Sequence, residues 1–71
     1  MQQLNSPPKI NSLYIINNYF IARITEIVEK DPWPYKGIIY HNDFTENAQW
    51  CKFGRCAKSY SKNLIKELSY D

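Results

Sequence analysis

The residues best suited to metal or thiol chemistry are two cysteines and the single histidine. Cys51 and Cys56 are separated by four residues, and His41 lies upstream of both. A structural zinc site needs four ligands, and this chain reaches that number only by adding Asp43. We therefore expect no metal site. A disulfide is geometrically possible if the cysteines face each other across a hairpin, although free thiols are expected in the cytosol.

The sequence has no pattern typical of an enzyme. One histidine and scattered serines do not form a nucleophile–base–acid triad. Glu26 and Glu29 lie where solvent-facing charges are expected, and two glycines do not make a phosphate-binding loop. We expect a protein without catalytic activity and without a cofactor.

Basic residues gather in the C-terminal half of the chain, where no acidic residue occurs from Cys51 to Lys66. Aromatic rings beside a basic groove are typical of proteins that bind single-stranded nucleic acid. If the protein binds single-stranded nucleic acid, as an alternative to binding a protein, the candidate residues are Lys52, Arg55, Lys58, Lys62, Lys66, Phe53 and Tyr60. The formal net charge of only +2 instead favours lysines that are ordinary solvated surface.

Large aromatic side chains are more numerous than a core of this size needs. Trp33 lies between two prolines, so it either covers the core as a lid or anchors a partner. Tryptophan, tyrosine and arginine are enriched at binding hot spots. The candidate protein-binding residues are Trp33, Tyr35, Tyr14 and Tyr40.

The chain of 71 residues predicts one small domain, with 44% hydrophobic and 15% aromatic residues. Residues 1–9 contain Ser6-Pro7-Pro8 and predict a flexible, extended N-terminal arm, followed by a single domain over 10–71. The start of the chain lacks the apolar core of a signal peptide, and no apolar run is long enough to span a membrane. We therefore expect a cytoplasmic protein without a membrane partner.

The first half of the domain predicts a hairpin. The apolar run 13–16 is followed by Asn17-Asn18, a pair that tolerates a tight turn. Residues 19–28 are rich in β-branched and aromatic side chains and predict a strand, with a helix over 21–28 as the alternative. A β-bulge near Thr25-Glu26 would return Ile27 to the core. Residues 31–34 predict a loop, because two prolines exclude regular pairing.

The second half predicts two further strands and a closing element. Residues 35–41 form one strand and 47–53 the next, with Trp50 and Ala48 on the core face near Phe20 and Ile24. A turn at Gly54 starts the return of the chain. Residues 61–68 fit either a short helical turn or a closing strand.

Together these elements predict a mainly β fold. We expect a strongly curled antiparallel sheet or barrel of about five strands, of the SH3-like kind. The strand 35–39 and the hairpin Trp50-Cys51-Lys52-Phe53-Gly54-Arg55 resemble a loose group of tiny phage and prophage β-barrel proteins, over residues 19–68. That resemblance implies a mobile-element origin and a small barrel. The expected function is a non-enzymatic module that binds a host protein, such as a defence protein, and blocks or redirects it.

Overall fold

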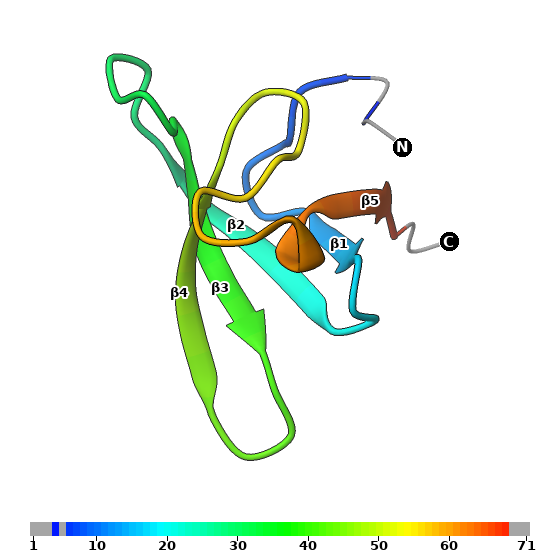
Figure 1. Cartoon of the computed structure of the whole chain (residues 1–71). Helices are drawn as coiled ribbons and strands as arrows, with labels where there is room; N and C mark the ends of the chain where they lie inside the picture. Colours follow the sequence, from blue (N-terminus) through cyan, green and yellow to red (C-terminus); the bar gives the residue numbers. More distant parts are fainter. Residues whose placement is uncertain (1–3, 5, 69–71) are drawn as a thin grey trace.

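A single antiparallel sheet organises the chain (Figure 1). The computed structural model describes residue 4 and residues 6–68, so the tip of the expected arm (1–3 and 5) and residues 69–71 lie outside it. The strands are β1 (Leu13–Ile16), β2 (Ile21–Ile27), β3 (Tyr35–Tyr40), β4 (Thr45–Trp50) and β5 (Leu64–Glu67). Their order across the sheet is β4-β3-β2-β1-β5. The expectation of a mainly β fold with five antiparallel strands is confirmed.

Strand β2 has the predicted bulge but not its predicted consequence. Its register with β3 shifts between Ile24 and Glu26, which confirms a bulge at this point. Ile27 is nevertheless 39% exposed, so the expectation that the bulge returns it to the core is wrong. Ile27 pairs with Tyr35 at the last rung between the two strands, where its side chain lines a hollow at the surface. The helical alternative for 21–28 is also wrong.

Strand β4 begins and ends earlier than predicted. It stops at Trp50, and a tight turn follows in which the Gly54 N–H donates a 2.9 Å hydrogen bond to the Cys51 carbonyl. Gly54 adopts a φ of 88°, which a glycine accepts without strain. The returning chain forms an isolated bridge between Cys56 and Trp50, so the hairpin continues for one pair beyond the turn.

The C-terminal segment is a short turn followed by a strand. A 3-10 turn, η1 (Tyr60–Lys62), begins where the Ser59 hydroxyl accepts a hydrogen bond from the Ser61 N–H. The chain then enters β5, which pairs with β1. Of the two alternatives for 61–68, the closing strand is correct for Leu64–Glu67.

The core lies on one face of the sheet. Its buried hydrophobic residues are Tyr14, Ile16, Ala22, Ile24, Ile39, Ala48, Trp50, Cys56 and Leu64. Trp50 is fully buried on the same face as Ala48, and Phe20 packs against this cluster, as predicted. Gly37 also faces inward, where an added Cβ would lie 2.1 Å from the Arg23 carbonyl oxygen. Only glycine allows the close approach of β2 and β3 at this point.

The segment between β4 and β5 connects the two edges of the sheet. The Ala57 N–H donates to the Gln49 carbonyl on β4 at 2.9 Å, and the Leu64 N–H donates to the Gly54 carbonyl at 2.8 Å. These hydrogen bonds occupy backbone groups that edge strands otherwise leave open to pairing with other chains.

Candidate functional site

The loop between β2 and β3 holds Trp33 in a fixed backbone position. The Asp31 carboxylate accepts a 2.9 Å hydrogen bond from the Trp33 N–H and pairs with the Lys36 ammonium at 2.9 Å. These two interactions lower the pKa of Asp31, the Trp33 N–H contributing most. The Val28 N–H donates to the Pro34 carbonyl at 2.8 Å and closes the base of the loop. Trp33 is therefore presented by a rigid turn.

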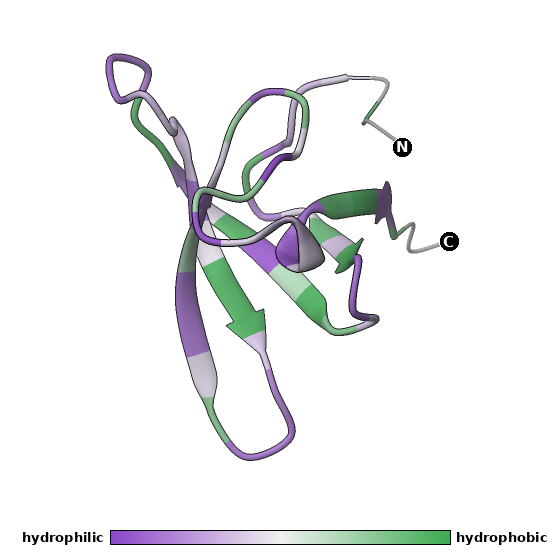
Figure 2. Cartoon of the chain, viewed as in Figure 1, coloured by the Kyte–Doolittle hydropathy of each residue, from purple (hydrophilic) through white to green (hydrophobic). Residues whose placement is uncertain are grey.

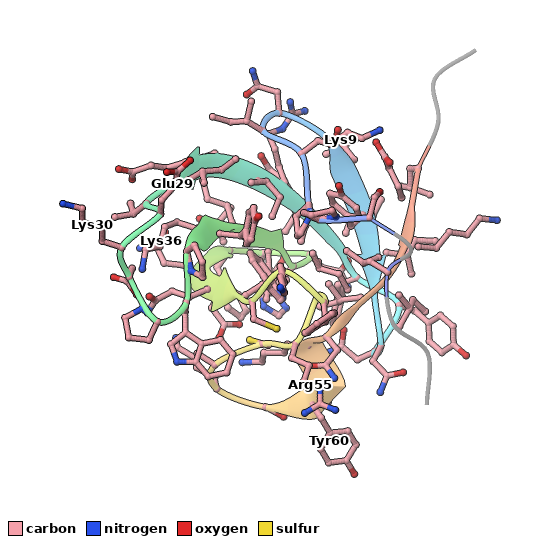
Figure 3. All side chains as sticks on the ribbon, turned by 90° about the horizontal axis from the view of Figure 1, so that it is seen from above. Lys9, Glu29, Lys30, Lys36, Arg55 and Tyr60 are labelled. Carbon is pink, nitrogen blue, oxygen red and sulfur yellow. The ribbon has the colours of Figure 1, made fainter. Side chains whose placement is uncertain are left out.

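A hollow of about 280 Å³ opens beside the Trp33 side chain. It is lined by Trp33, Arg55, Cys56, Tyr60 and Asn63, and we call it the Trp33 hollow. The sequence indicated Trp33 for protein binding and Arg55 and Tyr60 for nucleic acid, and the fold brings all three to one place. Arg55 is exposed and Tyr60 is 73% exposed, and both project from the same side of the molecule (Figure 3).

The lining of the Trp33 hollow is mainly apolar, and Asn63 lies at its buried side. Asn63 is 9% exposed, and its Oδ1 accepts a 2.7 Å hydrogen bond from the Cys56 N–H. This bond directs the amide oxygen to the backbone and leaves the amide NH₂ as a donor. Within residues 4 and 6–68, no acceptor is bonded to that NH₂ or to the Trp33 indole N–H. A mainly apolar lining with Trp33 and Tyr60 suits an apolar or aromatic group, and Arg55 and Asn63 are the polar residues around it.

Two of the predicted nucleic-acid lysines are bound to a carboxylate. Glu46 on β4 lies 2.5 Å from the Lys62 ammonium and 3.6 Å from the Lys58 ammonium. Its other oxygen contacts the His41 Nε2 at 2.8 Å. The hydrogen bonds from Lys62 and then His41 lower the pKa of Glu46 to about 2. We call these four residues the Glu46 cluster; its one carboxylate offsets one of the two lysine charges.

The other predicted nucleic-acid residues do not join one groove with Arg55. The Lys52 ammonium lies 5.2 Å from the centroid of the Phe53 ring, next to the turn after β4. Phe53 is 46% exposed. Lys66 is exposed on β5, opposite Ile15 of β1. The predicted set is thus divided between the Trp33 hollow, the Glu46 cluster and two separate surface positions.

The predicted protein-binding tyrosines also separate. Tyr14 is 2% exposed, so its proposed role in binding is wrong: it is a core residue whose hydroxyl accepts a 2.8 Å hydrogen bond from the Lys9 N–H. Burial raises its pKa. Tyr35 packs against the edge of the core, and Tyr40 is 39% exposed on the opposite face of the sheet. Only Trp33 of the predicted four lies in the Trp33 hollow.

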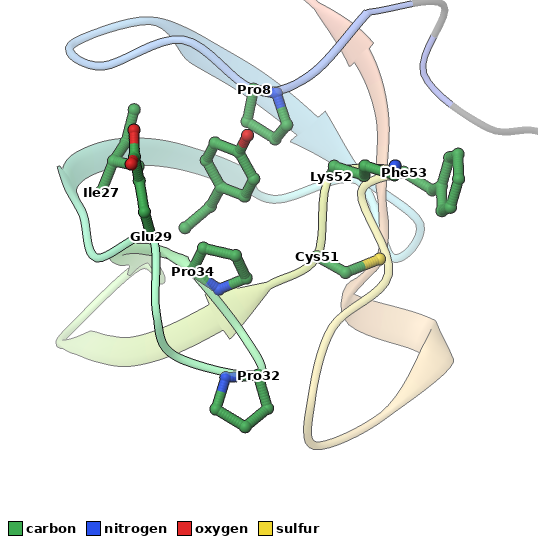
Figure 4. Close-up of a pocket in the computed structure, with 9 residues that line it drawn as sticks. Pro8, Ile27, Glu29, Pro32, Pro34, Cys51, Lys52 and Phe53 are labelled. Atoms are coloured by element: carbon green, nitrogen blue, oxygen red, sulfur yellow. The ribbon is translucent and has the colours of Figure 1, made fainter.

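A second hollow, of about 490 Å³, lies on the other side of the Trp33 loop. Pro32 and Pro34 line it, whereas Trp33 between them lines the Trp33 hollow, so consecutive side chains of the loop serve opposite sides. Pro8 from the N-terminal segment and Ile27 from β2 also line it (Figure 4). Three predicted site residues meet there as well: Tyr35, Lys52 and Phe53. The sequence assigned Tyr35 to protein binding and Lys52 and Phe53 to nucleic acid, and it could not show that they share one hollow with Pro8, which is distant along the chain.

The thiols and acids do not gather into a metal-binding group in the described part of the chain. Both cysteines are free, with Cys56 buried and Cys51 partly exposed. Residues 4 and 6–68 hold no cluster of three or more histidine, cysteine, aspartate or glutamate side chains suited to a metal ion. The same residues hold no helix long and apolar enough to cross a membrane.

The function of the Trp33 hollow is inferred from its geometry. Comparisons with protein-family models, with curated proteins and with solved structures found nothing that matches this chain.

Proposed function

We propose that the protein is a non-enzymatic protein-binding module that uses the Trp33 hollow to bind a host protein. The observation that carries this proposal is the meeting of Trp33, Arg55 and Tyr60 around one hollow. These are the three residue types most enriched among binding hot spots, where they fill or line well-packed pockets. The hydrogen bond from the Trp33 N–H to Asp31 supports the proposal, because a side chain on a fixed backbone loses less entropy on binding.

The rings and polar residues around the Trp33 hollow indicate the chemistry of the proposed partner. A peptide segment carries backbone carbonyl oxygens, and acidic side chains add carboxylates. Such a segment can place an apolar or aromatic side chain against Trp33 and Tyr60 while its oxygens accept from Asn63 and Arg55. We therefore propose a partner segment that combines one large side chain with acceptor groups.

The proposal also includes the fold type of the protein and its origin. The strand order, with the 3-10 turn η1 before the last strand, supports an SH3-like fold. The resemblance to tiny phage and prophage proteins supports a mobile-element origin and action on a host protein in the bacterial cytoplasm, for example as an inhibitor of a defence protein.

Affinity capture from a bacterial lysate tests the binding role. The wild-type chain, Trp33→Ala and Tyr19→Ala serve as baits, and captured proteins are quantified by mass spectrometry after nuclease treatment. Tyr19 is 84% exposed in the turn between β1 and β2, so its variant controls for the loss of an exposed aromatic ring. We expect a protein that is captured by the wild type and Tyr19→Ala and lost with Trp33→Ala. Equal capture by all three baits would contradict the proposal.

Binding of single-stranded nucleic acid is the second candidate, favoured by the aromatic rings and guanidinium of the Trp33 hollow. Phosphate contacts release counterions, so affinity for an oligonucleotide would fall steeply as the salt concentration rises. A triple Lys52/Arg55/Lys58→Ala variant would then lose most of its affinity. Absence of oligonucleotide binding at low salt, or binding unchanged in this variant, excludes the second candidate.

A further inference from the structure

The sheet has a second apolar face, opposite the core. Residues between the buried positions of β1, β2 and β3 point away from the core, because side chains alternate along a strand. We call this surface the outer face; it consists of Leu13, Ile15, Ile21, Arg23, Ile38 and Tyr40. Figure 2 shows hydrophobic residues along β1, β2 and β3, whereas the turns that join the strands are hydrophilic.

The strand register places these residues in two adjacent rows. In one row, Leu13 lies opposite Arg23, which lies opposite Ile38. In the next, Ile15 lies opposite Ile21, which lies opposite Tyr40. Side chains directly opposite each other on one face are in contact distance. Five apolar side chains therefore surround one guanidinium. Ile21 and Tyr40 are 38% and 39% exposed, and the other four are partly exposed.

The charge on the outer face is positive and has little internal compensation. Within residues 4 and 6–68, Arg23 has no carboxylate within 4.0 Å, and its side chain makes only a 3.4 Å hydrogen bond to the Asn11 carbonyl. Lys66 on β5 adds a second cation beside Ile15. The carboxylate of Glu26 lies in the following row, opposite Lys36. Two copies packed through their aliphatic rows would bring these cations together, which is unfavourable.

We propose that the outer face binds a second partner: an amphipathic helix of another protein, with an aliphatic stripe and a carboxylate placed to meet Arg23. The aliphatic rows match the stripe that such a helix buries against a sheet. A carboxylate forms paired hydrogen bonds with a guanidinium, and these strengthen as the surrounding aliphatic groups exclude water. This proposal goes beyond the protein-binding role of the Trp33 hollow and rests on separate residues.

Titration of the isotopically labelled protein with two synthetic helical peptides tests the proposal by NMR. Both peptides carry the same leucine stripe; one has glutamates beside the stripe and the other has lysines at those positions. We expect the acidic peptide to bind at least tenfold more tightly and to shift the resonances of the outer-face residues. Arg23→Glu should reverse this preference, and Ile21→Ser should weaken binding of the acidic peptide at least tenfold. Lys30→Glu, an equal charge change in the exposed loop after β2 (Figure 3), should leave the preference unchanged.

Several results would overturn the proposal. The first three are no binding of the acidic peptide, equal binding of both peptides, and resonance shifts confined to the Trp33 hollow. The fourth such result is a change of peptide preference in Lys30→Glu as large as that in Arg23→Glu. Shifts of the outer-face residues on dilution would identify a second copy as the occupant, and shifts with phosphatidylglycerol vesicles alone would identify a membrane surface. Trp33→Ala should bind the acidic peptide as the wild type does, so failure of the hollow and failure of the outer face are distinguishable.

Discussion

The indole N–H of Trp50 donates a 2.9 Å hydrogen bond to the backbone carbonyl of Lys62. This bond joins the largest residue of the core to the 3-10 turn η1, whose Lys62 ammonium reaches Glu46 on β4. The end of β4 and the entry to β5 are thus connected through one buried ring. The Trp33 hollow lies beside this connection, because Tyr60 belongs to η1 and Asn63 follows it.

Removal of the Trp50 side chain should largely unfold the protein. Trp50→Ala removes a fully buried ring, which costs about 3–5 kcal/mol of unfolding free energy. That cost approaches the whole stability of a small domain. Trp50→Phe keeps a buried aromatic ring but loses the hydrogen bond to the Lys62 carbonyl, so its unfolding free energy should fall by less than that of Trp50→Ala. Urea unfolding and amide chemical-shift dispersion measure both variants; a well-dispersed spectrum for Trp50→Ala would contradict the core position.

The Glu46 cluster should make the protein sensitive to acid. The pKa of Glu46 falls from 4.5 to about 2 on folding, so its contribution is complete above pH 4.5 and is lost as the pH falls toward 2. With solvent screening, we expect about 1–2 kcal/mol of unfolding free energy from this group. Glu46→Gln should be less stable at neutral pH and lose less stability between pH 4.5 and pH 2. Glu29→Gln, a change at an exposed residue, should follow the wild type. If the unfolding free energies of the wild type and Glu46→Gln change with pH in parallel, the Glu46 cluster contributes nothing to acid sensitivity.

Gly37 should not accept even the smallest side chain. In Gly37→Ala, the added Cβ meets the Arg23 carbonyl oxygen at 2.1 Å, so β2 and β3 must move apart. We expect a loss of at least about 1–3 kcal/mol of unfolding free energy, the usual range for overpacking. Asn47→Ala on the exposed face of β4 controls for a substitution within the same part of the sheet. Equal melting temperatures for the two variants would show that the strands have room to adjust.

The strands could be predicted from sequence because their signals are local. Alternation at Ala48 and Trp50 identified the core face of β4, and the break in alternation near Thr25 identified the bulge in β2. The run Leu13–Ile16 has no alternation, since one side of β1 faces the core and the other belongs to the outer face. Sequence alone therefore could not tell that Tyr14 points inward. A continuous apolar run of this kind indicates a strand that is apolar on both sides, and this signal could have revealed the outer face.

The candidate site depended on contacts between residues far apart in the sequence. Trp33 meets Arg55 and Tyr60 only because the Cys51–Gly54 turn and η1 return the chain beside the β2–β3 loop. The ion pairs of Glu46 with Lys58 and Lys62 also form only because the chain after Gly54 returns beside β4. No local pattern around these lysines indicates that they share one carboxylate in the fold.

The protein-binding role of the Trp33 hollow is tested most directly by measuring melting temperature and partner affinity on the same Trp33→Ala variant. Trp33 is partly exposed, and its loop is held by backbone and Asp31 contacts that the substitution keeps. We expect less than about 1 kcal/mol loss of unfolding free energy, and a loss of binding of at least about 2 kcal/mol, or about 30-fold in Kd. A large fall in melting temperature with unchanged affinity would contradict the role and make Trp33 a structural lid.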